Sequence, residues 1–427
     1  MGYQIKKAAI IGGGGTMGSL CGGIFASAGI PVIFFGLDNK EVEGGVERAV
    51  RQVRSDTIRD HIEKKTFEDM KEFLKDCDWV FEAVKEDLSL KKSMFEKIDE
   101  YRKKGSIVST VSSGLSIENL AEERSEDFQR HFAGVHFYNP PGVLLANEII
   151  YHKNAAEEVK NFIYEFCEKK LRRKNVITND TPAFAGNRIG FQFLNEALIF
   201  AETHGLEKTD YLLGAHTGRA MPPLATVDLV GMDVHKAVVD NIYQLTNDRK
   251  HDTFKLPGFA QKMFEQNILG RKTKSGLFKR DTENKKFTLN LQNFKYEPHK
   301  KVKLDFVEKI KSFIREADYH LAADAIKNNV SEEAKIIRYF ILNYISYSFS
   351  LIGEATPLEY GIDEIDKVMA HGFSWMPPSA WVDLFGGPKE VIAMMKNKNI
   401  DVPETLTSYK EDKICKIPSV TRYLIAK

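Results

Sequence analysis

Short apolar runs alternate with longer, more polar stretches over the first 150 residues of the chain. Between the first two runs, the small residues of 16–28 follow a glycine cluster and predict a helix. Strands that alternate with helices are typical of an α/β fold with a parallel, doubly wound sheet. The apolar runs predict strands at 7–11, 31–35, 78–84, 106–111, 132–138 and 147–151.

The pattern changes after about residue 180, where strand-like runs give way to long helical ones. Residues 187–203 and 332–354 predict two long helices, so we expect the second half of the chain to be all-α. Residues 339–353 carry no charge, but this run is shorter than the roughly 20 residues that cross a bilayer. It also contains Asn343 and three serines, which favours a buried helix of a bundle.

An internal repeat lies in this second half. The sequence MPPLATVDLVG at 221–231 returns as MPPSAWVDLFG at 376–386, with eight of eleven positions identical. Each copy follows a long predicted helix, which favours a duplicated helical domain over a shared local turn. We therefore expect domains at 1–180, 181–290 and 331–427, with 291–330 as a linker. The segment 280–303, rich in Lys, Asn and Asp, is the least patterned part of this region.

A glycine motif directly follows the first predicted strand. Gly13, Gly15 and Gly18 fit G-x-G-x-x-G, and Thr16 and Met17 occupy the positions before the last glycine. Between a strand and a helix, such a loop lets the backbone approach a pyrophosphate, which the helix N-terminus then binds. The motif predicts a Rossmann-type dinucleotide-binding domain, with a glycine turn that binds no ligand as the alternative.

The acid that would bind the adenosine ribose is harder to assign. Asp38 has the expected spacing of about 20 residues from the motif, but the strand itself ends at Gly36. If Gly36 occupies the acid's usual place, Asp38 must reach in from the loop. We expect NAD as the cofactor, because no arginine adjoins Gly36 to hold the 2′-phosphate of NADP. Lys40 lies close by in the sequence, so NADP stays an alternative.

Composition narrows the class of protein. The 427 residues include 61 basic and 60 acidic side chains, a net charge of +1 that argues against a nucleic-acid or membrane-surface protein. The four cysteines form no C-x-x-C pair, and no His–carboxylate cluster has metal-ligand spacing, so we expect no metal site. The N-terminus lacks the apolar stretch of a signal peptide, and we expect a cytoplasmic protein.

Several further segments, together with the glycine loop, resemble the L-3-hydroxyacyl-CoA dehydrogenase family. They are the stretch 109–114, the stretch 134–141 with Glu148 beyond it, the stretch 180–188, and 270–278, which is similar to the family's G-x-K-x-G-x-G-F-Y. The duplication resembles the long, fatty-acid-oxidation type. That type often carries a fused enoyl-CoA hydratase domain, and we expect this chain to work without one.

The resemblance assigns roles to individual residues. His136 matches the catalytic base and Glu148 its partner carboxylate, while Ser113 and Asn187 match residues that hydrogen-bond the substrate oxygen. An imidazole with a pKa of about 6.5 can take the alcohol proton at neutral pH while hydride leaves the carbon. A carboxylate on the other ring nitrogen would stabilise the imidazolium that forms.

Other matches concern the cofactor and the substrate. Glu86 and Lys91 match cofactor-contacting positions, whereas Val111 stands where the family has asparagine. The substrate implied is an L-3-hydroxyacyl-CoA, whose phosphates could meet three arginines that otherwise line a solvated helix face. These arginines are Arg51, Arg54 and Arg59.

Two other functions and two assembly states stay open. The chain could oxidise another 3-hydroxy acid, or act as a weakly active dinucleotide-binding scaffold. A separate enoyl-CoA hydratase or thiolase is a conceivable partner. Short relatives bury the apolar face of their helical domain by dimerisation, and a second helical copy in the same chain could bury that face instead. This predicts a pseudo-dimeric monomer, with a homodimer as the alternative.

Overall fold

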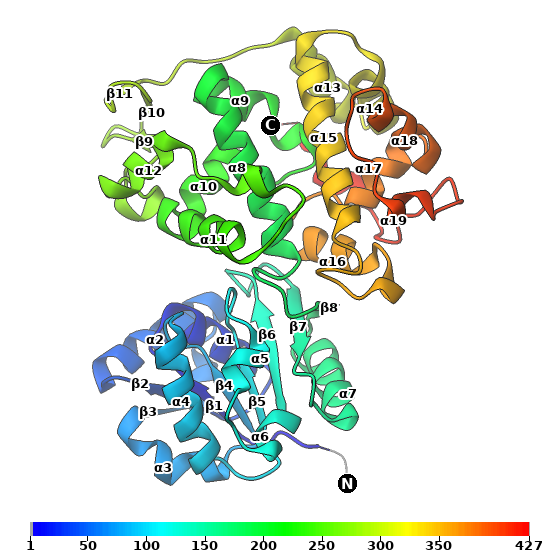
Figure 1. Ribbon diagram of the computed structural model, residues 1–427. Coiled ribbons are helices and arrows are strands. Elements are labelled where there is room, and N and C mark those ends of the chain that lie inside the picture. The colour runs from blue at the N-terminus through cyan, green and yellow to red at the C-terminus, as the bar shows by residue number, and fades with distance from the viewer. Residues whose placement is uncertain (1–2, 427) are drawn as a thin grey trace. The chain divides into compact units, whose positions relative to one another are not determined.

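The computed structural model describes residues 3–426, which divide into two compact units that meet between Phe184 and Ala185 (Figure 1). The boundary expected at residue 180 therefore lies four residues too early, because the segment 181–184 belongs to the first unit. Among the described residues, no helix combines the length and the apolar character that a membrane span requires.

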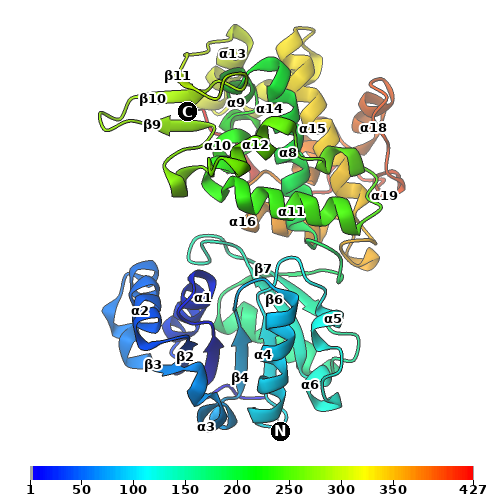
Figure 2. The same cartoon turned by 60° about the vertical axis from the view of Figure 1, so that its left-hand side comes forward.

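The first unit is built on an eight-stranded sheet with the order β3-β2-β1-β4-β5-β6-β7-β8, whose strands are labelled in Figure 1. Figure 2 shows the same sheet from another side, with β2, β3, β4, β6 and β7 labelled. All neighbouring strands run parallel except β6 and β7, which pair antiparallel. The strands are β1 (Ala8–Ile11), β2 (Val32–Gly36), β3 (Ile62–Thr66), β4 (Trp79–Glu82), β5 (Ile107–Thr110), β6 (Phe132–Phe137), β7 (Ala146–Tyr151) and β8 (Lys174–Ile177).

The doubly wound α/β fold is confirmed, with two differences in the sheet. Each of the six predicted strands is present to within two residues at either end, but β3 and β8 were not predicted. The sheet is also mixed, because β7 returns antiparallel beside β6 through a loop and not through a crossover helix.

Both faces of the sheet are covered by helices. Ala8 and Ile10 of β1 pack into one core with α1 (Thr16–Ser27), α2 (Asn39–Val53) and α7 (Glu157–Glu165). Ala9 and Ile11 point to the other face and pack against the remaining helices, as the two-residue period of a strand requires. Those helices are α3 (Met70–Phe73), α4 (Leu88–Tyr101), α5 (Ile117–Ala121) and α6 (Glu126–Arg130).

The second unit is largely helical (Figure 1), and the two predicted long helices are its α8 and α15. The uncharged stretch 339–353 lies mostly in α15 and is largely buried there. The helices are α8 (Gly186–His204), α9 (Leu206–Leu212), α10 (Pro223–Val230), α11 (Met232–Leu245), α12 (Gly258–Glu265), α13 (Asp305–Arg315), α14 (Tyr319–Asn328), α15 (Glu332–Ser350), α16 (Asp363–Gly372), α17 (Pro378–Leu384), α18 (Pro388–Lys396) and α19 (Glu404–Thr407).

The predicted linker is wrong in two respects. The segment 280–303 contributes to a small antiparallel sheet of β9 (Phe278–Arg280), β10 (Lys286–Leu289) and β11 (Tyr296–Pro298), so this unit is not all-α. The range 291–330 carries α13 and α14. The amphipathic spacing of α13 was visible in the sequence, because its buried residues recur at helical intervals: Phe306, Val307, Ile310 and Ile314.

Equivalent contacts in the two halves of this unit support the duplication. In the first half, the Asp210 carboxylate accepts the Leu224 N–H at the start of α10, at 2.7 Å. In the second half, Asp366 accepts the N–H of Ser379 at the start of α17, at 3.3 Å. The two helices begin inside the two copies of the repeated sequence.

A second pair of aspartates also makes equivalent contacts in the two halves. Asp228 of the first repeat accepts the backbone N–H of Leu277, at 2.7 Å, and Asp383 of the second accepts that of Ile414, at 2.8 Å. The halves also meet through an antiparallel bridge between Arg219 and Trp375, just before the two repeats. An antiparallel bridge of this kind is what a two-fold relation between copies produces.

These buried aspartates predict a pH dependence of stability. Burial raises the pKa of Asp366 to about 8, whereas a carboxyl group in the unfolded chain has a pKa near 3.9. Between these pH values the native state holds a proton that the unfolded chain has already released. The stability that this proton contributes is fully present below the unfolded pKa, declines as pH rises above it and is lost once pH passes about 8. We expect Asp366→Asn to flatten this decline, measured by urea denaturation at a series of pH values. Parallel curves for the two proteins would contradict it.

Candidate functional site

The glycine loop joins β1 to α1 at the carboxyl end of the sheet. Gly15 is the N-cap of α1, and the first turn of this helix contains no acidic side chain. A Cβ at Gly18 would lie 2.1 Å from the carbonyl oxygen of Gly12, so only glycine lets the helix approach the loop. The exposed Thr16 and its uncapped first turn leave backbone N–H groups and the positive end of the helix dipole open to a phosphate. The loop therefore fits a dinucleotide.

A buried ion pair lies at the ends of the next strands. Glu82 ends β4, and its carboxylate accepts hydrogen bonds from Lys91 Nζ at 2.8 and 2.9 Å and from Thr110 Oγ1 at 2.6 Å. The side chains of Glu82 and Lys91 are fully buried. Lys91 was predicted to contact the cofactor, but its ammonium is held by Glu82 and lies 3.4 Å from Glu86. Lys91 therefore positions these two carboxylates.

Glu86 organises the loop that follows β5. Its Oε1 accepts the hydroxyl of Ser112 at 2.6 Å and the backbone N–H groups of Ser113 and Gly114 at 2.9 and 3.0 Å. Burial would raise the pKa of Glu86, but Lys91 and these hydrogen bonds outweigh it and lower the pKa. An ionised Glu86 thus fixes the backbone that carries Ser113.

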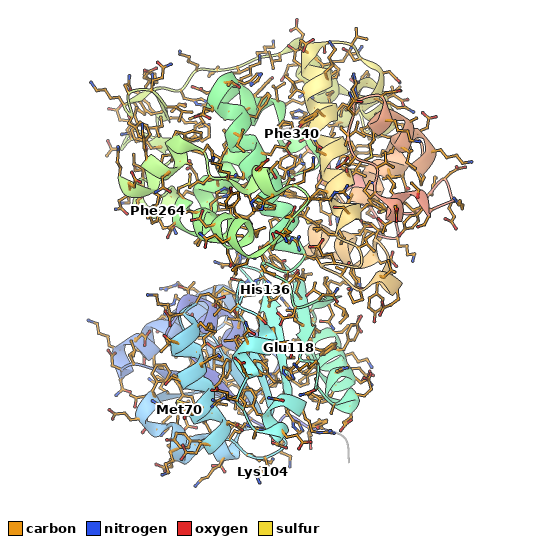
Figure 3. The ribbon with its side chains drawn as sticks, viewed as in Figure 1. Met70, Lys104, Glu118, His136, Phe264 and Phe340 are labelled. Carbon is orange, nitrogen blue, oxygen red and sulfur yellow. The ribbon has the colours of Figure 1, made fainter. Side chains whose placement is uncertain are left out.

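The antiparallel pairing of β6 with β7 brings His136 and Glu148 together. The two residues are directly opposite each other in the register, so their side chains lie on the same face of the sheet. His136 Nδ1 and Glu148 Oε2 are 2.8 Å apart, and both side chains are buried. This hydrogen bond leaves Nε2 as the ring nitrogen that can exchange a proton with a ligand. In Figure 3, His136 lies at the opposite end of the first unit from Lys104, which precedes β5.

Tyr138 is a third member of this cluster that sequence reasoning missed. Its hydroxyl donates to the same Oε2 of Glu148, at 2.7 Å. Burial, together with the neighbouring Glu148, raises the pKa of Tyr138 well above its ordinary value, so the phenol stays protonated as a donor. Its place two residues after the histidine, at the end of the predicted strand 132–138, was the available signal, because such residues share a face of a strand.

Tyr138→Phe tests this positioning role. Removing a donor from a buried carboxylate costs about 1–3 kcal/mol of stability. The freed carboxylate should also bind the imidazole more strongly, so we expect the acidic limb of the kcat–pH profile to move to higher pH and kcat to fall by less than about tenfold. Urea denaturation and the kcat–pH profile measure the two effects. An unchanged pH profile would reduce Tyr138 to a packing residue.

The remaining predicted residues are on two different units. Ser113 is half-buried on the loop after β5, and Val111 beside it packs against the apolar core on one face of the sheet. Asn187 is the second residue of α8 in the other unit, and it is not the N-cap. The next residue, Arg188, is buried and pairs with Asp248 at 2.6 Å, which anchors the start of α8.

The acid at the end of β2 differs from the prediction. The Asp38 carboxylate accepts the backbone N–H of Glu41 at 2.8 Å and caps α2. Glu41, which sequence reasoning missed, places Oε2 2.7 Å from the backbone nitrogen of Leu37, directly after Gly36. A carboxylate therefore does lie at the strand end, but it comes from the first turn of the following helix.

Other features lie apart from this set of residues. Of the three arginines considered for CoA, Arg59 is paired with Glu47 at 2.7 Å. A cavity of about 610 Å³ in the second unit is lined mainly by basic side chains and includes none of the predicted site residues. Across residues 3–426, no three His, Cys, Asp or Glu side chains are grouped to hold a metal ion.

Comparison with known families covers both units. Residues 7–181 match the model of the "3-hydroxyacyl-CoA dehydrogenase, NAD binding domain". Residues 184–280 match that of the "3-hydroxyacyl-CoA dehydrogenase, C-terminal domain".

Two similar proteins extend this result. A "Probable 3-hydroxyacyl-CoA dehydrogenase" of Deinococcus radiodurans is 37% identical over 66% of this chain and 85% of its own length. A protein of the same name from Bacillus subtilis is 29% identical over 94% of this chain but 53% of its own length. The chain thus spans about half the length of the Bacillus relative.

Solved structures share the fold. A 3-hydroxybutyryl-CoA dehydrogenase from Escherichia coli K12 covers 98% of both chains with a TM-score of 0.68 and 18% identity, which extends the similarity in fold through the second helical half. An (S)-3-hydroxybutyryl-CoA dehydrogenase from Ralstonia eutropha is 25% identical over 64% of this chain, with a TM-score of 0.56.

Proposed function

Because the chain belongs to the 3-hydroxyacyl-CoA dehydrogenase family, we propose that it oxidises an L-3-hydroxyacyl-CoA to the 3-oxoacyl-CoA with NAD⁺. The single observation that supports this most is the 2.8 Å contact between His136 and Glu148. A buried imidazole held on one nitrogen by a carboxylate is a suitable base for an alcohol.

The reaction removes a hydride ion from carbon and a proton from oxygen and passes them to two different acceptors. Bound NAD⁺ would take the hydride from the carbon that carries the hydroxyl group. His136 takes the hydroxyl proton at Nε2, and the carbon–oxygen bond becomes a carbonyl. Glu148 holds the Nδ1 hydrogen and stabilises the imidazolium that results, while Tyr138 keeps Glu148 in place.

Two further side chains would act on the substrate oxygen. Ser113 and Asn187 match family positions that hydrogen-bond this oxygen, and in the reverse direction they would polarise the carbonyl. The hydrogen bonds from Ser113 and Gly114 to Glu86 support the role of Ser113, because they fix its backbone before substrate binds.

The activity is tested with 3-hydroxybutyryl-CoA and NAD⁺, followed by NADH absorbance. We expect NADH to form with the (S) enantiomer and not with the (R) enantiomer. Oxidation of free 3-hydroxy acids but not of the CoA thioester would favour the alternative dehydrogenase. NADH binding without turnover of either substrate would favour a dinucleotide-binding scaffold.

We also infer that the chain is a pseudo-dimeric monomer. The equivalent aspartate contacts in the two helical halves and the bridge between Arg219 and Trp375 support this inference, because the second half covers the first as a partner subunit would. Light scattering at micromolar concentration should give the mass of one 48.5 kDa chain. A stable mass twice as large would contradict it.

A further inference from the structure

We propose that Glu41, and not Asp38, is the residue that binds the adenosine ribose hydroxyls of NAD and makes the site selective for NAD over NADP. In dinucleotide-binding folds this role belongs to an acid at the end of the second strand, which hydrogen-bonds the ribose 2′-hydroxyl. In this chain that position is Gly36, the last residue of β2. The proposal rests on NAD binding and goes beyond the oxidation itself.

The Glu41 carboxylate occupies the space that a side chain at Gly36 would fill. A Cβ built on Gly36 would lie 2.9 Å from Glu41 Oε2. The same Oε2 is 2.7 Å from the backbone nitrogen of Leu37, whose N–H it accepts. The same Cβ would lie 2.7 Å from Val42 Cγ2, so the packing of α2 favours glycine at 36 and leaves the strand end to the Glu41 carboxylate.

The same carboxylate also borders the glycine loop. A Cβ on Gly14, the variable position of G-x-G, would lie 2.7 Å from Glu41 Cδ. Glu41 thus lies between the end of β2 and the loop that fits the pyrophosphate. A ribose joined to that pyrophosphate must occupy this neighbourhood.

The close packing of α2 on the loop explains how Glu41 reaches this place. A Cβ on Gly45, one turn further along α2, would lie 2.2 Å from the carbonyl oxygen of Gly13. Arg48 lies one turn beyond Gly45 and donates to the carbonyl oxygen of Gly14. Glu41, Gly45 and Arg48 therefore form one helix face that contacts the loop, at the spacing that places residues on one face.

Helix capping alone does not account for the Glu41 contact. Asp38 and Glu41 have the spacing of a capping box, in which the glutamate would accept the N–H of the N-cap residue itself. Asp38 does cap α2, but Glu41 accepts the N–H of Leu37, one residue earlier. Oε1 makes no hydrogen bond within the part of the chain that the structure describes, so it can accept a ribose hydroxyl.

The charge of Glu41 also sets the cofactor preference. A 2′-phosphate in this place would bring a second negative group against the carboxylate, which is unfavourable at short range. Arg48 on the same helix face is a cation that could compensate, but its guanidinium already donates to the Gly14 carbonyl and to Ser19 Oγ.

NADH and NADPH binding test the proposal without turnover, by fluorescence titration of the full chain. Hydrogen bonds to a charged acceptor contribute strongly to the free energy of binding. We therefore expect Glu41→Ala to weaken NADH binding by about 10- to 100-fold. NADPH binding should weaken less or improve, so the ratio of the two affinities falls. Asp38→Ser, which keeps a capping side chain, is the matched control and should bind NADH within about twofold of wild type.

Three results would overturn the proposal. They are unchanged NADH affinity in Glu41→Ala, a loss confined to Asp38→Ser, and a loss of NADH and NADPH affinity in equal proportion. Thermal denaturation of each variant without cofactor separates a binding defect from unfolding, and Glu41→Gln, which keeps the shape, repeats the test if Glu41→Ala unfolds. Wild-type NADH binding without oxidation would contradict the proposed function but not this assignment.

Discussion

His136→Gln is expected to lower kcat by about 10²-fold or more, the scale on which enzymes depend on a general base. Glutamine fills a similar volume but cannot take the alcohol proton at neutral pH. Glu148 would then hold an amide in place of an imidazole. Steady-state NADH formation with saturating substrate measures the loss.

A second histidine in the same unit supplies the control for this variant. His152 is buried and lies 3.2 Å from Glu118, so it is also a histidine–carboxylate pair. His152→Gln should change stability and leave kcat within about twofold of wild type. NADH affinity should be unchanged in both variants. A His136→Gln protein with nearly wild-type turnover would remove His136 from the proposed role.

Arg188→Leu is expected to lower the free energy of unfolding by about 3–5 kcal/mol, the cost of breaking a buried ion pair from one side. The Arg188 guanidinium donates to Asp248 at 2.6 and 3.0 Å and lies 2.5 Å from Glu354. Without it, the Asp248 carboxylate, whose side chain is 1% exposed, keeps as partners among the described residues the hydroxyl of Tyr347 and the backbone N–H of Lys250.

An exposed pair in the same unit provides the comparison for Arg188. Arg249 lies 3.2 Å from Asp401, with 39% and 64% of the two side chains exposed, and it too joins the first helical half to the second. Arg249→Leu should cost less than about 1 kcal/mol, because water and salt screen such a pair. Urea denaturation measures both variants. Equal losses would show that burial does not govern the Arg188 contact.

The sheet and the glycine loop could be predicted because their signals are local. Buried parallel strands are continuous apolar runs, and the G-x-G-x-x-G spacing needs no distant partner to be recognised. By contrast, β3 contains two lysines and a glutamate and is only partly buried, so no apolar run marked it. The antiparallel return of β7 depends on the loop before it, which the apolar pattern does not describe.

The site was harder to predict wherever long-range register decides the contacts. The family resemblance indicated His136 and Glu148, but only the pairing of β6 with β7 places them opposite each other. Tyr138 lies just past the end of β6 and donates to the same carboxylate, a role that the resemblance did not assign to it. For the ribose-binding acid, the spacing from the glycine motif favoured Asp38. The packing of α2 on the glycine loop instead brings Glu41 to the end of β2.

The pairing of His136 with Glu148 is tested most directly by comparing single-turnover NADH formation in four proteins: wild type, His136→Gln, Glu148→Gln and the double variant. If the carboxylate acts only through the imidazole, the double variant will be no slower than His136→Gln, although Glu148→Gln alone is slow. Losses that multiply in the double variant, or a Glu148→Gln protein as fast as wild type, would contradict the account.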